Sequence, residues 1–309
     1  MKEKVVVIAG PTAVGKSEAG IKLASHFQGE IISGDSMQIY KGLDIGTAKV
    51  SKEERAGIPH YLIDECEPDD SFSASAFKEA AQKRIEEINQ RGKLPFIVGG
   101  TGFYIQSVLR NLDFHDAPSD EEFRNKMETY VRNHGRTALH EKLKQQDEES
   151  ARSIHPNNTK KVIRALEIRH VTGKTKQPFA RREPTTFHYD HIIIGLTMDR
   201  NVLYSRINER VDKMVEAGLV EEAKWLYDHY PPNVQAAQAI GYKEFFPYFR
   251  GDCSLEEAAA QLKKNSRHYA KRQLTWFRNK EEVEWFDMTA GPREEKIEKM
   301  IRWIEGKYK

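Results

Sequence analysis

The sequence predicts an α/β protein built on a doubly wound parallel sheet, with an all-helical domain inserted. Apolar runs of strand length alternate with helix-like patterns over the first hundred or so residues, which is typical of successive βα units. Residues 115–184 then carry helical patterns and no strand pattern, and a buried-strand pattern returns at 191–196. We therefore expect a core made of residues 1–114 and 185–309, with the helical insertion at 115–184.

The first predicted strand leads into a glycine-rich stretch. Lys4–Ala9 is an apolar run rich in β-branched residues, as in buried parallel strands. The next residues are Gly10, Pro11, Thr12, Ala13, Val14, Gly15, Lys16 and Ser17, and a helical pattern follows from Glu18. G-x-x-x-x-G-K-S between a strand and a helix is a phosphate-binding loop, in which backbone N–H groups and the helix N-terminus face an anion. Lys16 adds a cation and Ser17 a hydroxyl for Mg²⁺. A plain glycine-rich turn would require neither, so we predict a site for a di- or triphosphate.

The remaining elements follow in order. Strands are expected at Glu30–Ser33, His60–Asp64 (an edge strand), Leu94–Val98, His191–Leu196 and Val283–Phe286. Helices of the core are expected at Ser73–Gln90, Arg200–Ala217, Leu219–Tyr230, Leu255–Arg278 and Pro292–Ile304, with loop and a short helix over 44–59. In the insertion we expect a helix capped by Ser119, more helix through Leu143, a third helix from Asn157 to Gly173, and a linker at Thr175–Pro184.

Composition indicates a globular protein outside membranes. Of 309 residues, 39% are hydrophobic and 31% are charged, and no apolar run approaches the roughly 18 residues that span a bilayer. No signal-peptide pattern precedes the first strand. Cys66 and Cys253 are isolated, which does not suit a metal knuckle or a disulfide framework. We expect a cytoplasmic monomer.

Positive charge is concentrated in two stretches. Arg152–Arg182 contains nine Lys/Arg and one acid, and Lys263–Lys280 contains seven Lys/Arg and no acid, whereas the whole chain carries only +2. Chance clustering on exposed helices could produce one such stretch. Two of them favour a polyanionic partner such as nucleic acid.

Two polar residues are expected at the carboxyl edge of the sheet, where open α/β folds bind ligands. Asp35 follows the strand 30–33, and Thr101 follows the strand 94–98 and its paired glycines. Switch and motor NTPases usually carry a magnesium-binding acid at the end of a second strand, but here strand 94–98 ends in Gly99-Gly100. The pattern resembles the small-molecule kinases, P-loop kinase-like enzymes in which such a carboxylate contacts the acceptor rather than ATP. The simpler alternatives are a turn-forming or helix-capping role for Asp35 and a helix-capping role for Thr101.

Several motifs together resemble the tRNA dimethylallyltransferases. These are Gly10–Ser17, Asp35-Ser36-Met37-Gln38-Ile39-Tyr40, Gly46-Thr47-Ala48-Lys49, Gly99–Tyr104, Arg164-Ala165-Leu166-Glu167 and Ala239-Ile240-Gly241-Tyr242, in order along the chain. Small departures are Val14, Phe103 and Lys161, which stands where arginine is common. The two isolated cysteines do not suit the C-terminal zinc finger of eukaryotic relatives, so we expect none.

The resemblance implies a reaction and a set of residues. Dimethylallyl would pass from dimethylallyl diphosphate to N6 of the adenosine 3′-adjacent to the anticodon (position 37), releasing diphosphate. Residues 10–17 would hold the diphosphate, with Mg²⁺ assisted by Ser17, and Asp35 and Thr101 would be catalytic. The implied tRNA contacts, made with the anticodon stem-loop, are Asp35, Ser36, Met37, Gln38, Thr101, Arg124, Lys160, Lys161 and Arg164.

Two other interpretations remain open at this point. A small-molecule kinase that uses ATP on a nucleoside or alcohol would explain the loop and Asp35 but not the basic insertion. A nucleotide-gated RNA-binding protein would explain the basic stretches, but such switches normally carry the strand-end acid that is missing here. Roles for Arg206 and Arg210, which share a helix face, are left unassigned.

Overall fold

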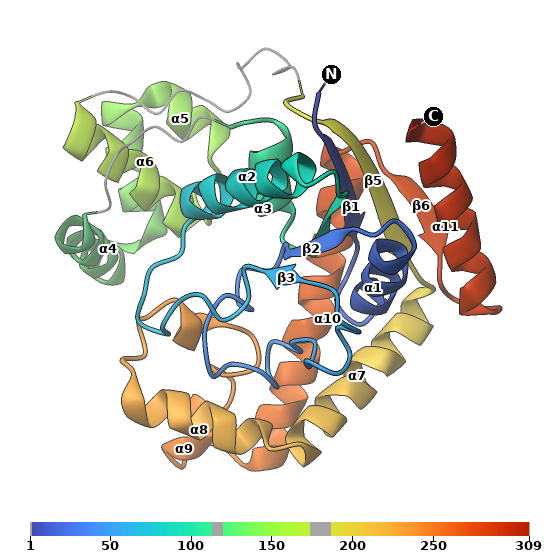
Figure 1. Cartoon of the computed structure of the whole chain (residues 1–309). Coiled ribbons are helices and arrows are strands. Elements are labelled where there is room, and N and C mark those ends of the chain that lie inside the picture. The colour runs from blue at the N-terminus through green and yellow to red at the C-terminus, as the bar shows by residue number, and fades with distance from the viewer. Residues whose placement is uncertain (1, 113–119, 174–186, 309) are drawn as a thin grey trace. The chain divides into compact units, whose positions relative to one another are not determined.

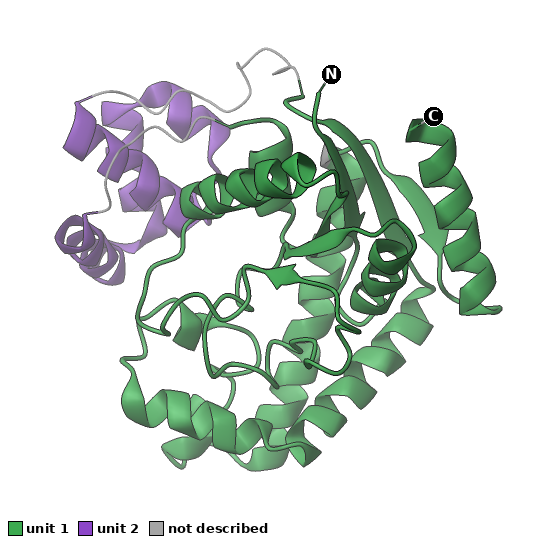
Figure 2. Cartoon of the chain, viewed as in Figure 1, with its two compact units in different colours: residues 1–112, 187–309 green, residues 113–186 purple. Residues whose placement is uncertain are grey.

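The computed structural model describes residues 2–112, 120–173 and 187–308. The chain divides into two compact units: Met1–Leu112 with Phe187–Lys309, and Asp113–Thr186 (Figure 2). The boundaries predicted at 114/115 and 184/185 fall outside the described residues, as do the predicted cap Ser119 and the linker Thr175–Pro184.

The first unit is built on a six-stranded sheet in which every pairing is parallel (Figure 1). The strands are β1 (Lys4–Ala9), β2 (Glu30–Ser33), β3 (His60–Tyr61), β4 (Pro95–Gly99), β5 (Asp190–Thr197) and β6 (Glu284–Asp287). Their order is β3-β2-β4-β1-β5-β6. The predicted strands and the edge position of β3 are confirmed. β4 lies between β1 and β2, so the residues that follow these three strands are neighbours at one edge.

Helices cover both faces of this sheet, as the doubly wound prediction requires. They are α1 (Lys16–His26), α2 (Ala74–Gln90), α3 (Gly102–Leu109), α7 (Arg200–Glu216), α8 (Leu219–His229), α9 (Phe246–Phe249), α10 (Leu255–Lys280), α11 (Arg293–Tyr308) and the 3₁₀ turn η2 (Ala236–Gln238). Alternate residues of β1 enter two separate cores: Val5 and Val7 pack with α2 and α3, and Val6 and Ile8 pack with α1 and α11. Figure 1 shows α2 and α3 on the opposite side of the sheet from α1 and α11.

Two local predictions differ from the structure. Residues 44–59 form turns without the expected short helix. The helix α3 was not predicted, because it has only eight residues and begins at a glycine. Gly102 is required there for space, since a Cβ would lie 2.1 Å from Cδ1 of Trp276.

The described residues of the second unit form helices and the turns that join them, without a strand. It contains α4 (Glu121–Gln146), α5 (Glu148–Ser153) and α6 (Thr159–Thr172), which enclose a small core that includes Met127, Leu139, Leu143, Val162 and Leu166. Asp120 caps α4 by accepting a hydrogen bond from the N–H of Phe123. Gly135, with φ of 83°, interrupts the helical geometry of α4.

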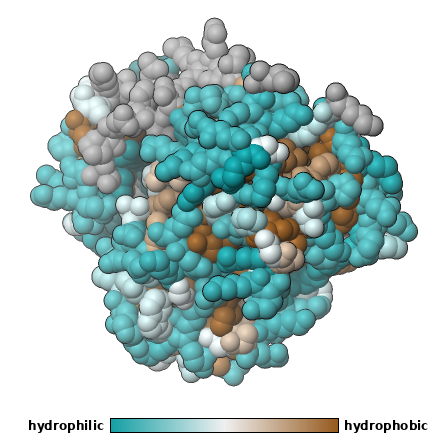
Figure 3. Space-filling view, in the orientation of Figure 1, coloured by the Kyte–Doolittle hydropathy of each residue, from teal (hydrophilic) through white to brown (hydrophobic). Residues whose placement is uncertain are grey.

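The surface is mainly polar, as the charged content predicts. Figure 3 shows a largely hydrophilic face with apolar residues gathered near its centre. Among the described helices, none combines the length and apolar character needed to cross a membrane.

Candidate active site

The phosphate-binding loop connects β1 to α1 and depends on two glycines in backbone conformations that other residues avoid. Gly15, with φ of 104°, immediately precedes α1. Gly10 has φ of 149°, and a Cβ there would lie 2.6 Å from the carbonyl oxygen of Leu196. The loop therefore presents its N–H groups and the N-terminus of an eleven-residue helix to the same space, which favours an anion.

Lys16 lies at the start of α1 with its ammonium folded back over the loop. Nζ donates a hydrogen bond to the carbonyl oxygen of Pro11 at 2.7 Å. Desolvation lowers the pKa of Lys16 from 10.5 to about 7; the Asp35 carboxylate raises it in part, and Arg210 lowers it further. An anion placed in the loop would offset this desolvation, because an opposite charge favours the ammonium form.

Asp35 and Thr101 come together beside the loop, as the strand order requires. The Thr101 hydroxyl accepts a hydrogen bond from the N–H of Ser36 at 3.2 Å, and the Thr101 N–H donates to the carbonyl oxygen of Gly34. Thr101 also precedes α3, but its side chain makes no capping hydrogen bond. The simpler explanation of Thr101 as a helix cap is therefore wrong.

The Asp35 carboxylate is held in place by its own turn. Oδ1 accepts a hydrogen bond from the N–H of Met37 at 2.8 Å. Burial raises the pKa of Asp35, and the Met37 N–H and the Lys16 ammonium oppose part of that rise. The turn-forming role is thus real, and the Gln38 N–H also opposes part of the rise in the pKa. A desolvated carboxylate is nevertheless well suited to accept a proton.

A residue that the sequence analysis missed, Gln273, joins α10 to this edge of the sheet. Its buried side chain accepts a hydrogen bond from the N–H of Thr12 at 2.9 Å and donates one to the carbonyl oxygen of Gly100 at 3.1 Å. A Cβ on Gly100 would lie 2.0 Å from Gln273 Nε2. The sequence analysis predicted the helix and its positive charge but gave Gln273 no role, although a glutamine on the buried face of an amphipathic helix is a signal for such a contact.

Two cavities meet at this edge. The larger, of about 880 Å³, is lined by Lys16, Ser17, Arg206 and Arg210 among others. The smaller, of about 300 Å³, contains Asp35. Its other lining residues include Thr12, Ser36, Met37, Ile207, Val211, Leu262, Tyr269 and Arg272. Arg210 lines both cavities, which connects α7 and its two arginines to the site.

Burial also affects the tyrosine that lines the Asp35 cavity. It raises the pKa of Tyr269 to about 12, and the Asp35 carboxylate contributes to the rise. The Tyr269 phenol is therefore uncharged near neutral pH and can only donate or accept a hydrogen bond. The cavity thus combines polar groups near Asp35 with the apolar side chains of α7 and α10.

The predicted tRNA contacts of the insertion fall into two kinds. Lys160 and Lys161 are exposed on α6. Arg124 and Arg164 instead pair with the fully buried carboxylate of Glu167, at 2.8 and 2.7 Å. Burial alone would raise the pKa of Glu167, but hydrogen bonds from Arg164, the Asp120 N–H and Arg124 outweigh it and hold that pKa low. Arg124 and Arg164 therefore neutralise a buried carboxylate within this unit, whether or not they also contact RNA.

The loop fits a magnesium ion that is shared with a substrate. In the part of the chain that the structure describes, no cluster of three His, Cys, Asp or Glu residues could hold a metal ion. Ser17 is exposed in the large cavity and offers its hydroxyl. Since Mg²⁺ usually retains waters and binds substrate phosphates with few protein ligands, a single hydroxyl is compatible with such a site.

A parallel α/β sheet with a phosphate-binding loop and a half-buried carboxylate at the same edge defines a class of enzymes that bind a phosphorylated substrate beside an acceptor. Comparison with known proteins narrows this class. The family model described as IPP transferase matches residues 38–280. The chain belongs to this family.

Individual relatives agree over nearly the whole chain. A tRNA dimethylallyltransferase of Halalkalibacterium halodurans is 53% identical over 308 residues, covering 99% of this chain and 98% of the relative. The crystal structure of a full-length tRNA isopentenylpyrophosphate transferase from Bacillus halodurans, 51% identical, has a TM-score of 0.76 and covers 99% of this chain and 97% of that one. A eukaryotic dimethylallyltransferase described as acting on tRNA is 32% identical, with a TM-score of 0.80, covering 93% of this chain and 74% of that one.

Proposed function

We propose that this protein transfers a dimethylallyl group from dimethylallyl diphosphate to N6 of the adenosine 3′-adjacent to the anticodon (position 37) of tRNA, releasing diphosphate. The observation that carries the proposal is the meeting of the phosphate-binding loop and Asp35 at one sheet edge, in a member of the IPP transferase family. The proposed enzyme is a cytoplasmic monomer, and its RNA substrate is recognised through the anticodon stem-loop.

The donor diphosphate would lie in the loop formed by residues 10–17. Charge builds up on the diphosphate as the bond to the prenyl carbon breaks. N–H groups of the loop and the Lys16 ammonium would stabilise that charge, which is how preorganised donors accelerate such a step. Mg²⁺, held by the Ser17 hydroxyl and diphosphate oxygens, would supply further neutralisation.

The acceptor amine would lie beside Asp35. Its lone pair is delocalised into the adenine ring, so it becomes nucleophilic only as a proton is shared away. Asp35 would accept that proton through the carboxylate oxygen that does not bind the Met37 N–H. Thr101 would hold the reacting groups in line, and its hydroxyl already orients the Ser36 N–H.

The RNA must present an extruded base, because N6 is not accessible within a stacked loop. Asp35, Ser36 and Met37, which line the small cavity, would contact that base. Lys160 and Lys161 would bind phosphates, with Arg124 and Arg164 nearby in the same unit. Gln38 is engaged in contacts within the chain, so its part in tRNA binding would be indirect.

The small-molecule kinase considered above has no support among the relatives, whose names are those of tRNA dimethylallyltransferases and isopentenyl transferases. The deciding experiment mixes the protein with labelled dimethylallyl diphosphate, Mg²⁺ and unmodified tRNA, and in parallel with labelled ATP. We expect label from the prenyl donor in a single modified adenosine of the RNA. ATP consumption in proportion to acceptor modification, with no use of the prenyl donor, would contradict the proposal.

A further inference from the structure

The segment Asp44–Lys49, called here the partition turn, lies along the border between the two cavities. Ile45 and Lys49 line the larger cavity, Gly46 and Thr47 line the smaller one, and Ala48 lines both. This irregular stretch has no strand or helix of its own to fix it. Two backbone hydrogen bonds close the turn, from the N–H of Ala48 to the carbonyl oxygen of Ile45 and from the N–H of Lys49 to that of Asp44. Side chains tie the turn to the rest of the unit.

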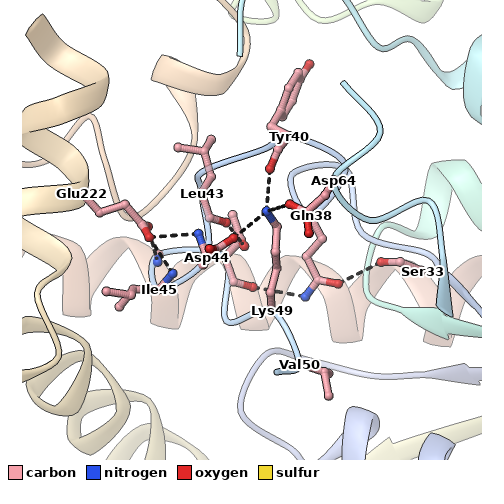
Figure 4. Close-up of polar contacts among 12 residues, drawn as sticks. Ser33, Gln38, Tyr40, Leu43, Asp44, Ile45, Lys49, Val50, Asp64 and Glu222 are labelled. Carbon is pink, nitrogen blue, oxygen red and sulfur yellow. Dashed lines mark hydrogen bonds and ion pairs between the residues drawn. The ribbon is translucent and has the colours of Figure 1, made fainter. Parts of the chain in front are cut away.

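Glu222 of α8 fixes one end of the partition turn. Its carboxylate accepts three backbone hydrogen bonds, from the N–H groups of Asp44, Ile45 and Gly46, all at 2.9 Å (Figure 4). The phenol of Tyr242, which is buried, donates a fourth at 2.6 Å. A carboxylate that accepts four hydrogen bonds has little freedom to rotate, so it holds three successive amides in a defined geometry.

Lys49 fixes the other end from within the loop. Its side chain is only 4% exposed, and Nζ donates to the carbonyl oxygen of Tyr40 at 2.6 Å and to Asp44 Oδ1 at 2.8 Å. It also pairs with the carboxylate of Asp64. Figure 4 shows Lys49 between these three acceptors. A desolvated ammonium with three acceptors ties the turn to the segments before and after it.

Gln38 connects the partition turn to the catalytic carboxylate. Its side-chain amide donates to the carbonyl oxygens of Thr47 and Ala48 at 3.2 and 3.4 Å, and its oxygen accepts from the Ser33 hydroxyl at 2.9 Å. The same Ser33 oxygen accepts from the N–H of Asp35 at 3.4 Å. A shift of the turn would therefore be transmitted to the Asp35 backbone through two side chains.

We propose that Glu222 and Lys49 are positioning residues for the transfer reaction, which hold the partition turn so that the donor and the acceptor meet in line. This role rests on the proposed function. Neither side chain needs to touch a reacting atom. Their effect would be on alignment, where a displacement of about 1 Å can reduce the rate ~10²-fold.

The test compares Glu222→Gln and Lys49→Met with two matched controls. These are Glu221→Gln on the same helix and Lys41→Met, three residues before the partition turn. Glu221 is exposed, and Lys41 forms a surface ion pair with Glu67 at 52% exposure. We expect kcat with both substrates saturating to fall about 10- to 100-fold in the two variants, while tRNA affinity changes less than about twofold. Amide hydrogen exchange over residues 44–46 should accelerate in Glu222→Gln. The controls should match the wild type in every measurement.

A structural role alone predicts a different pattern. Faster exchange or easier unfolding with unchanged kcat per folded molecule in Glu222→Gln would overturn the positioning role. If Lys49→Met does not fold, Glu222→Gln decides the question, since it exchanges only one oxygen for an NH₂ group. If the wild-type protein shows no prenyl transfer, the proposed function is refuted and this role with it. If the wild type transfers the prenyl group but the variants keep its kcat, only the positioning role is refuted.

Discussion

Lys16 couples its own protonation to the binding of diphosphate in the loop. Its pKa is lowered to about 7, chiefly by desolvation, so near pH 8 the protein without donor holds mostly a neutral amine here. Bound diphosphate would raise that pKa again, because opposite charges stabilise one another more strongly in a desolvated site. Diphosphate binding and proton uptake should therefore be coupled.

The prediction is that diphosphate binding takes up close to one proton through Lys16 at pH 8 and almost none at pH 6, where the lysine is already charged. Calorimetric titrations in buffers of different ionisation enthalpy measure this uptake. Lys16→Ala should weaken binding of the donor and slow release of diphosphate, and it should remove the pH-dependent uptake. Equal uptake by the wild type and Lys16→Ala would show that Lys16 does not titrate with binding.

Single residues near strand ends could be placed from the sequence, because the carboxyl ends of neighbouring parallel strands share an edge. That rule placed Asp35 and Thr101 beside the loop. It could not find Gln273, which binds Thr12 at a distance of 261 residues along the chain, or Glu222, which binds Asp44 at a distance of 178 residues. Such contacts depend on how α8 and α10 pack, and no local pattern encodes that packing.

At the scale of elements, α6 shows why basic residues in one helix are not equivalent. Arg164 pairs with buried Glu167, whereas Lys160 and Lys161 are exposed. Removal of Arg164 would leave a buried carboxylate with fewer partners, which destabilises a fold regardless of RNA. A test of RNA binding should therefore leave Arg164 in place.

We predict that replacing both Lys160 and Lys161 by alanine weakens tRNA binding. The slope of log K against log salt concentration should become shallower by about 0.7–0.9 for each phosphate contact that is lost. Donor affinity should be unchanged, since the donor site lies in the other unit. Lys144→Ala, which removes an exposed lysine from α4, is the matched control. An unaltered slope in the double variant would exclude α6 as a phosphate-binding surface.

The strands and the long helices were predicted well, whereas the shortest helices were not. The strand Lys4–Ala9 and the helix at 200–216 have enough periodic residues to define themselves. The helix α9 has four residues and α5 has six, so neither contains a full repeat of the pattern. Residues 44–59 resemble a short helix in composition, but hydrogen bonds made by Glu222 and Lys49 hold their first turn instead.

At the scale of the whole molecule, the residues of the first unit that precede the insertion contact those that follow it. The N–H of His188 donates to the carbonyl oxygen of Leu109, and the Arg110 guanidinium lies 5.2 Å from the centre of the Phe187 ring. The two chain ends at the insertion point are therefore neighbours. This arrangement suits an inserted domain, which can be exchanged without unfolding its host.

The prediction is that replacing residues 113–186 with a short Gly-Ser linker leaves a cooperatively folded first unit. That unit should bind diphosphate within a few-fold of the wild-type affinity, because the loop, Lys16 and Arg210 all belong to it. Its affinity for tRNA should fall steeply. Thermal unfolding, calorimetry and an RNA-binding titration give the three readings, and a failure to bind diphosphate would contradict the independence of the first unit.

The central claim is that Asp35 accepts the N6 proton while the loop holds the leaving diphosphate. The most direct test is single-turnover prenyl transfer by Asp35→Asn with tRNA and dimethylallyl diphosphate both saturating. Asparagine keeps the shape of the side chain and can still accept the Met37 N–H, but it presents no anionic acceptor. We predict that both substrates still bind and that the rate falls ~10²–10⁴-fold, the usual contribution of a general base. Transfer at the wild-type rate would contradict the claim and would leave Asp35 as a positioning residue only.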